Sequence, residues 1–269
     1  MLLLFASFVL LASACNKNTA DTAAAAATSA TAEGPQSADT DNNRPGDPAA
    51  TVENVPLPET NYFEITTRLG RMVIRLYDET PGHRDNFKKL AAEGFFDGTR
   101  FHRVMNEFMI QGGDPLSKDD DPMNDGTGGP GYTIPAEFNT AFLHKKGALA
   151  AARQPDNVNP NKESSGSQFY IVHGRPFMSA EMDQIERQTR ISFPDDVRAV
   201  YETVGGAPFL DMGYTVFGEL VEGFDVLDAI ATTPTPNSTQ QRVHPALGDQ
   251  PVEPIEMMVS PIAGYDEAQ

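Results

Sequence analysis

Two short segments, far apart in the chain, constrain most strongly what it can fold into. They are residues 101–114 (FHRVMNEFMIQGGD) and residues 166–171 (GSQFYI). Both alternate large apolar residues with a few polar ones, which is typical of strands with one face on a core and the other on a site. If the two are neighbouring strands, one surface carries a guanidinium, two carboxamides and several apolar side chains. That surface holds no nucleophile, general base or cluster of metal ligands.

These segments resemble the cyclophilins, which are peptidyl-prolyl cis-trans isomerases. The resemblance rests on Phe-His-Arg, Phe-Met and Gln-Gly-Gly-Asp within residues 101–114 and on Gly-Ser-Gln-Phe at 166–169. It continues with Leu-Asp at 210–211 and Val-Phe-Gly-Glu at 216–219. The motifs follow the order and approximate spacing of the family across most of residues 62–262. A single motif would be weak, whereas this succession is a specific signal.

The chemistry can be argued from the residues. Rotation about an X-Pro bond breaks amide resonance against a barrier of roughly 18–20 kcal/mol, and no covalent bond has to break. In the twisted state the prolyl nitrogen regains a lone pair that accepts a hydrogen bond. A donor aimed at that nitrogen binds the twisted state better than the planar state, as catalysis requires. Arg103 suits this role because its guanidinium stays protonated and presents several donors in a rigid plane.

An apolar pocket favours the same rotation. The planar amide is the more dipolar form, so transfer from water into an apolar site disfavours the planar state more than the twisted one. The candidates to line such a pocket around the proline ring are Phe108, Met109, Tyr170 and Phe209. Gln111 is a candidate to orient Arg103 or to hold the substrate backbone.

The resemblance assigns roles to several of these residues. Arg103 falls on the catalytic arginine of the family, and Gln111 falls on its substrate-binding glutamine. Phe108, Met109 and Tyr170 fall on its proline pocket. Gln168 belongs to the same binding groove. We therefore take Arg103 and Gln111 as the candidate catalytic residues.

Some positions depart from the family pattern. Phe209 stands where many members carry a tryptophan, and Tyr214 stands where many carry a histidine. Both remain aromatic, so we expect the pocket to persist. Residues 150–154 (AAARQ) replace a stretch that carries Ala-Asn-Ala in familiar members, whose asparagine contacts substrate largely through its backbone. Ala152 and Arg153 are therefore kept as candidate substrate-binding residues.

Each of these residue types also has an ordinary structural role. Apolar residues on strands most often simply pack, and a lone arginine is most often a surface charge or an ion-pair partner. Only their order relative to Arg103 supports the functional interpretation. We interpret His102 as structural, since the histidines lack the spacing of metal ligands. The glycines at 112–113 and 128–131 are interpreted as turns. No metal or cofactor is expected.

The first residues are predicted to be a targeting signal rather than part of the folded domain. Residues 2–12 form an apolar run too short to span a bilayer comfortably, and Ser-Ala-Cys follows at 13–15. This pattern resembles a bacterial lipoprotein signal, whose cleavage leaves Cys15 as the lipid-modified amino terminus. The alternatives are an ordinary secretory peptide and a buried terminal helix. Asn16 follows the cysteine where an aspartate favours inner-membrane retention, which indicates the outer membrane.

Residues 16–60 differ in composition from the rest of the chain. They are rich in Ala, Thr, Ser and Asp, and have too little large apolar surface to offset the entropy of ordering. We predict a disordered linker, with a short helix over the alanines at 23–27 as the alternative. The formal net charge of -18 argues against sequence-independent nucleic-acid binding. We expect a monomer, lipid-anchored through Cys15 on the periplasmic side of the bacterial envelope, with proline-containing polypeptides as partners.

The remaining chain, residues 61–263, is predicted to be mainly β. Strands are predicted over residues 62–68, 70–77, 99–104, 108–111, 148–152, 168–172, 215–221 and 255–259. A helix is predicted from Thr80-Pro81 to about Glu93, with Thr80 as its capping residue, and another over residues 224–231. Many strands with few helices favour a closed antiparallel barrel. The resemblance makes this a closed eight-stranded antiparallel barrel capped by two helices.

A segment at about residues 175–208 is longer than the compact members of the family have. Residues 179–188 and 194–204 show helical start signals and apolar spacing, which predicts a helical hairpin beside the pocket. Our hypothesis is that this insertion narrows or extends the substrate groove.

The sequence favours an enzyme that accelerates X-Pro rotation in envelope proteins. The alternative is a non-catalytic proline-peptide-binding chaperone of the envelope, and a third interpretation is a lipid-anchored scaffold. Arg103, Phe108 and Gln111 occurring together favours the enzyme, because a binder has no need of that guanidinium.

Overall fold

The computed structural model describes residues 56–265, which belong to the unit Val52–Gln269. The predicted signal segment 1–15, with Cys15, and most of the predicted linker 16–60 lie outside the described residues. None of the helices within 56–265 has the length and apolarity needed to cross a membrane.

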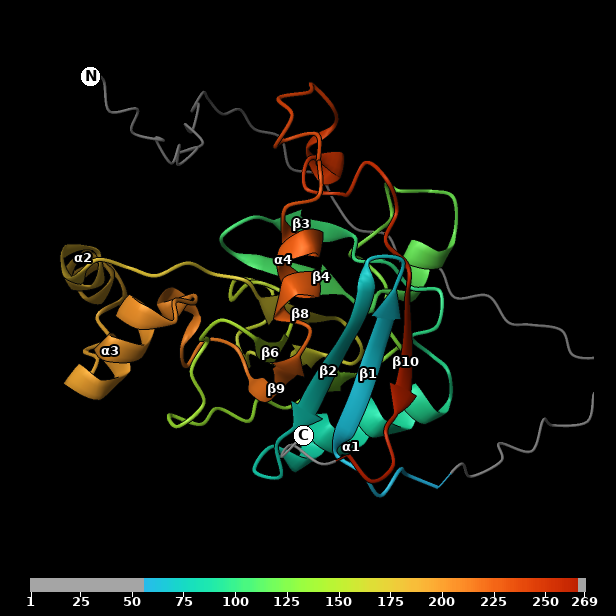
Figure 1. Cartoon of the computed structure of the whole chain (residues 1–269), viewed down its shortest axis with the longest axis horizontal. Coiled ribbons are helices and arrows are strands. Elements are labelled where there is room, and N and C mark those ends of the chain that lie inside the picture. Colours follow the sequence, from blue (N-terminus) through green and yellow to red (C-terminus); the bar gives the residue numbers. More distant parts are fainter. Residues whose placement is uncertain (1–55, 266–269) are drawn as a thin grey trace, which may run out of the picture. The chain divides into compact units, whose positions relative to one another are not determined.

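One eight-stranded sheet dominates the described residues, and every neighbouring pair in it is antiparallel (Figure 1). Its strands, in spatial order, are β10 (Met257–Pro261), β1 (Tyr62–Thr67), β2 (Gly70–Leu76), β9 (Val216–Glu222), β6 (Ala148–Ala151), β8 (Phe169–Val172), β4 (Met109–Gly112) and β3 (Arg103–Met105). A second, two-stranded sheet pairs β5 (Thr133–Ile134) with β7 (Ser164–Ser165), which the sequence did not predict.

Alternation along the strands gives the large sheet two apolar faces. In β8, Phe169 and Ile171 join the main core cluster, whereas Tyr170 and Val172 join a second cluster on the opposite face. The same division separates Ile110 from Met109 in β4. Because side chains of a strand alternate between faces, one strand supplies both the core and the wall of a site.

The prediction of a closed barrel is wrong in one respect. The end strands β3 and β10 form no ladder with each other, and the chain before β3 meets the chain around β10 at the isolated bridge Arg100–Glu256. Two backbone bonds flank this bridge, from Phe101 N to Ile255 O at 2.9 Å and from Met257 N to Thr99 O at 2.8 Å. The edge of β3 is covered instead by a loop, since Val104 N donates to Asp249 O at 2.7 Å. The strand predicted over 99–104 is therefore reduced to β3.

Two helices bury their apolar faces in the main core. They are α1 (Pro81–Ala92), which contributes Phe87 and Leu90, and α4 (Phe224–Ala231), which contributes Leu227 and Ile230. Both confirm helices predicted from the sequence. Short 3-10 helices lie at η1 (Pro115–Lys118), η2 (Pro208–Leu210) and η3 (Pro245–Leu247).

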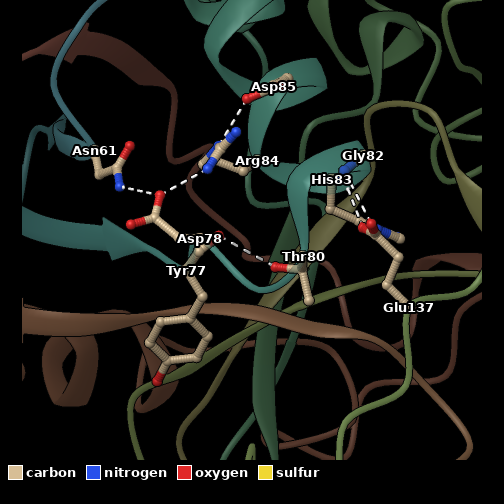
Figure 2. Close-up of polar contacts among 9 residues, drawn as sticks. All are labelled: Asn61, Tyr77, Asp78, Thr80, Gly82, His83, Arg84, Asp85 and Glu137. Atoms are coloured by element: carbon tan, nitrogen blue, oxygen red, sulfur yellow. Dashed lines mark hydrogen bonds and ion pairs between the residues drawn. The ribbon is translucent and has the colours of Figure 1, made fainter.

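Thr80 is the N-cap residue of α1, as predicted, but the expected capping bond from its side chain is missing. The side chain of Thr80 makes no capping bond and lies instead against Tyr77 O, at 3.5 Å. Figure 2 shows that Glu137, from a distant loop, takes this place: its carboxylate accepts from Gly82 N at 2.9 Å and from His83 N at 3.0 Å. The same carboxylate contacts His83 Nδ1 at 2.6 Å. A negative charge suits a helix amino terminus, and this one also ties the loop to the helix.

The insertion forms the predicted helical hairpin, α2 (Ser179–Thr189) and α3 (Asp195–Thr203), at one side of the sheet (Figure 1). The two helices enclose a cluster of their own, in which Met182, Phe193 and Tyr201 are buried. Gly206 holds the base of the hairpin, since it bridges Arg175 at the start of the insertion. A Cβ at Gly206 would lie 2.2 Å from a backbone oxygen, and its φ of +150° also disfavours other residues.

Glu137→Gln should destabilise the fold by about 1 kcal/mol, as loss of a helix cap does. Burial alone would raise the pKa of Glu137, but the bonds from His83 and the helix amides outweigh it and leave that pKa below its usual value. The stabilisation is therefore present above the unfolded pKa and fades as pH falls through the folded one. Urea unfolding at pH 7 and pH 3 checks this. Glu79→Gln, an exposed control, should change neither curve.

Candidate active site

Sheet register places the candidate residues in one row. Arg103 of β3 lies directly opposite Gln111 of β4, and Gln111 lies opposite Tyr170 of β8. Tyr170 in turn lies opposite Ala150 of β6. Residues directly opposite each other share a face of the sheet, so the guanidinium, the carboxamide and the phenol ring adjoin on the face away from the main core.

A line of hydrogen bonds fixes the polar part of this row. Arg103 Nη1 lies 3.4 Å from Gln111 Oε1, and Gln111 Nε2 donates to Gln168 Oε1 at 3.1 Å. Gln168 Nε2 then donates to Gly128 O at 2.8 Å. Each carboxamide thus accepts on one side and donates on the other, which sets its orientation. The longest contact is the one to Arg103, so this donor is the easiest to redirect towards a ligand.

The guanidinium of Arg103 is held from several sides but remains accessible. Its Nη2 lies 3.2 Å from Met105 Sδ, and its Nε lies 3.7 Å from Asp249 Oδ2. Its Cζ lies 5.9 Å from the centroid of the Phe108 ring, a cation–π contact. The side chain is 43% exposed. The guanidinium of Arg103 is therefore oriented by its neighbours, but it is not engaged in a buried ion pair.

An apolar slot adjoins the guanidinium. Met109 and Tyr170 are buried, Phe108 is half-buried, and Leu210 packs on the same cluster. Tyr170 and Tyr214 meet edge to face with ring centroids 6.0 Å apart. The walls of the slot are therefore aromatic rings, the thioether of Met109 and the side chain of Leu210.

The slot and the polar row belong to one groove with a volume of about 970 Å³. The predicted site residues that line it are Arg103, Phe108, Met109, Gln111, Ala152, Arg153, Gln168, Tyr170 and Tyr214. Phe209 does not line the groove; its ring contacts that of Phe108, with centroids 5.6 Å apart, and 46% of its residue surface is exposed. The structure thus brings together all the predicted catalytic and substrate-binding positions except Phe209.

Arg153 lies in the groove wall with its charge turned away from the opening. Its side chain is 6% exposed, and its Cζ sits 4.5 Å from the centroid of the Tyr214 ring. Its Nε donates to Gly213 O at 2.7 Å, and its Nη1 contacts Asp156 at 2.6 Å. The guanidinium therefore supports the Tyr214 ring, and little of this side chain is exposed for contact with a ligand.

Several groove residues escaped the sequence analysis. Leu210, Asp249 and the loop at 125–133 line the groove alongside the predicted residues. Leu210 belongs to the Leu-Asp motif, so a signal existed for it. Asp249 and the loop carry none, because only the folded chain brings them beside Arg103 and Gln168. His102 also lines the groove, and burial lowers its pKa, so it is not a cation there.

The insertion contributes no residue to the lining of the groove, so the hypothesis that it narrows or extends the groove gains no support. The residues that line it come from segments before and after α2 and α3, and none comes from residues 175–208. The hairpin instead packs behind η2, whose last residue is Leu210.

Comparison with known proteins places these features in a family. The model of the "Cyclophilin type peptidyl-prolyl cis-trans isomerase/CLD" family matches residues 62–257. The chain therefore belongs to the cyclophilin-type peptidyl-prolyl cis-trans isomerases. Its sheet, with α1 and α4 packed on the core, is the cyclophilin-like fold.

Relatives support the same enzyme class. A putative peptidyl-prolyl cis-trans isomerase of Staphylococcus haemolyticus is 36% identical over 171 residues, which is 62% of this chain and 78% of that protein. A putative bifunctional phosphatase/peptidyl-prolyl cis-trans isomerase of Streptococcus pyogenes is 38% identical over 196 residues. That match covers 70% of this chain and only 37% of the streptococcal protein, which is thus much longer than the shared region.

Solved structures share the fold. The crystal structure of a Cryptosporidium parvum cyclophilin type peptidyl-prolyl cis-trans isomerase superposes with a TM-score of 0.55 at 22% identity, covering 76% of this chain and 99% of that one. A second structure of the same protein, determined in the presence of the dipeptide Ala-Pro, gives a TM-score of 0.53.

Asp125→Asn should stabilise the protein more at pH 7.5 than at pH 4. Burial, followed by the nearby charge of Asp114, raises the pKa of Asp125 to about 6. A raised folded pKa means that stability is lost as pH rises through it, and the neutral amide escapes that loss. Thermal unfolding at the two pH values checks this. If Asp125→Asn changes the melting temperature equally at both pH values, the Asp125 carboxyl ionises as freely in the folded protein as in the unfolded chain.

Proposed function

We propose that this chain catalyses cis-trans isomerisation of X-Pro bonds in the groove, with Arg103 as the donor to the prolyl nitrogen. The observation that carries the proposal is the adjacency of an oriented, accessible guanidinium and an apolar slot. Both act on the same bond. The slot holds the proline ring and the arginine meets the nitrogen at its edge.

Electrostatics explains how this lowers the barrier. Each 1.4 kcal/mol by which the twisted state is favoured over the planar one gives about a tenfold rate increase. The guanidinium supplies a charge-assisted hydrogen bond that forms only once the nitrogen has lost conjugation. Because Arg103 is already aimed by Gln111 and Met105, little reorganisation is needed at that moment.

The slot provides the second contribution. Phe108, Met109 and Tyr170 replace water around the amide, and the more dipolar planar form loses more from this exchange. Gln111 and Gln168, held by their mutual bond, are placed to bind the substrate backbone. Tyr214 closes the far wall. The proposed mechanism uses the apolar slot, the guanidinium of Arg103 and the carboxamides of Gln111 and Gln168. It forms no covalent intermediate.

Proline-containing polypeptides are the proposed substrates. The related Cryptosporidium protein, whose structure was determined in the presence of Ala-Pro, supports a dipeptide-sized ligand for such a fold. The apolar run followed by Ser-Ala-Cys supports attachment through a lipid on Cys15, and we propose that the anchored protein is a monomer. Substrates would then be proteins of the bacterial envelope, on the periplasmic side and at the outer membrane.

Arg103→Ala should abolish catalysed exchange in a short Ala-Pro-Phe peptide while the peptide still binds. Two-dimensional NMR exchange spectroscopy measures both effects. Arg71→Ala is the matched control, because Arg71 is 44% exposed, makes ion pairs with Glu64 and Glu222, and lies outside the groove. It should retain the full rate. Shifts without exchange in the unaltered protein would instead identify a non-catalytic proline-peptide-binding chaperone.

Cys15→Ser should release the protein from the membrane fraction of a bacterial host that processes lipoproteins. The serine has no thiol to accept a lipid, whereas the apolar run that precedes it is unchanged. Fractionation followed by immunoblotting measures the distribution. Retention of the variant in the membrane at the original level would rule out lipid attachment at this residue.

A further inference from the structure

Four buried polar side chains form a line behind the apolar slot. Tyr201 Oη donates to Asp211 Oδ2 at 2.6 Å, and Asp211 Oδ1 lies 2.8 Å from His144 Nδ1. His144 Nε2 then lies 3.0 Å from Tyr170 Oη. Tyr201 and His144 are fully buried, and Tyr170 and Asp211 nearly so. The line runs from the insertion to the wall of the groove.

Donors and acceptors in this line can be assigned. A carboxylate only accepts, so His144 Nδ1 donates to Asp211, and an imidazole with one proton then accepts at Nε2 from Tyr170. The backbone amide of His144 adds a further bond to Asp211 Oδ1 at 2.9 Å. Burial, together with the charge of Asp211, raises the pKa of Tyr201, and burial does the same for the pKa of Tyr170. Both hydroxyls therefore keep the proton that they donate.

The two ends of the line belong to different parts of the fold. Tyr201 lies in α3 of the insertion, which contributes nothing to the lining of the groove. Tyr170 lies in β8 and forms part of the groove wall. Asp211, in the middle, immediately follows Leu210, another lining residue. A single carboxylate thus joins the insertion to two walls of the slot.

We propose that Tyr201 is a positioning residue for the groove: its hydroxyl holds Asp211, and through Asp211 and His144 it fixes Tyr170 and Leu210. This rests on the proposed binding of proline peptides in the groove. The insertion then acts as a buttress of the pocket rather than as an added wall. Its contribution is to affinity, since Arg103 has no contact with this line.

Loss of the Tyr201 hydroxyl would leave Asp211 Oδ2 buried without its donor. A buried acceptor that loses its partner is unfavourable, so the carboxylate should turn and release His144. Tyr170 and Leu210 then sample several positions, and a peptide must order them again on binding. The aromatic packing of residue 201 against Phe193 remains in a phenylalanine variant.

Tyr201→Phe should raise the Kd of an Ala-Pro-Phe peptide about fivefold, in the range expected for one such hydrogen bond, with kcat changed less than twofold. Tyr265→Phe is the matched control. It removes a hydroxyl bonded at the same 2.6 Å to the carboxylate of Glu222, away from the groove. Its Kd should be unchanged. A folded Tyr201→Phe protein with the original Kd would overturn the proposal.

A double-mutant cycle separates positioning from a general loss of stability. Tyr170→Phe removes the branch of the line that reaches Tyr170, so once it is present Tyr201→Phe should weaken binding by clearly less than its effect in the unaltered protein. If the Kd of the double variant instead rises by the product of the two single effects, the two tyrosines act independently. That result would contradict the proposal. Both tests measure peptide affinity. A failure of the proposed catalysis in the Arg103 experiment would therefore not change the Kd values on which they depend.

A further test uses the unaltered protein, so it does not depend on whether a variant folds. Filling the groove with the peptide should shift the ring proton resonances of Tyr201, although no residue of α3 lines it. The ring protons of Tyr265 serve as the reference and should not move. A Tyr201 spectrum that is the same with and without saturating peptide would refute the coupling.

Discussion

The register of the antiparallel strands β3, β4 and β8 is the constraint on which the rest of the site depends. It sets Arg103, Gln111 and Tyr170 side by side on the face away from the core. A slip of one residue in β4 would turn Gln111 inward and Ile110 outward, and would lose both the core contact and the groove. The burial of Ile110 therefore stabilises the same alignment that the proposed chemistry needs.

Around this row the protein meets two opposite demands. In the proposed mechanism the slot excludes water so that the planar amide is disfavoured, while the guanidinium stays charged and accessible. The structure separates them, with apolar rings on one side and a line of amides on the other. The buried line from Tyr201 to Tyr170 lies beneath the rings, where its groups are bonded to one another. Polar groups thus support an apolar wall without opening it to solvent.

Local sequence patterns predicted helices and strands well where interactions within the segment itself determine the structure. The helix over 224–231 and the strands around 62–77 follow apolar periodicity, and they formed at the expected places. The failures came from distant partners. Glu137, not the adjacent Thr80, meets the amides of α1, and the loop at Asp249, not a strand, covers the edge of β3. Spacing along the chain carries no information about either.

The sequence by itself determined the family, the mainly β fold and the residue types of the groove, because alternation and ordered motifs are written along the strands. Only the tertiary structure decided that Phe209 packs on Phe108 without lining the groove, that the guanidinium of Arg153 stacks on Tyr214, and that the insertion lines none of the groove. These outcomes depend on which side chains meet across long loops. Packing and hydrogen bonding in three dimensions select them, and residue order alone does not.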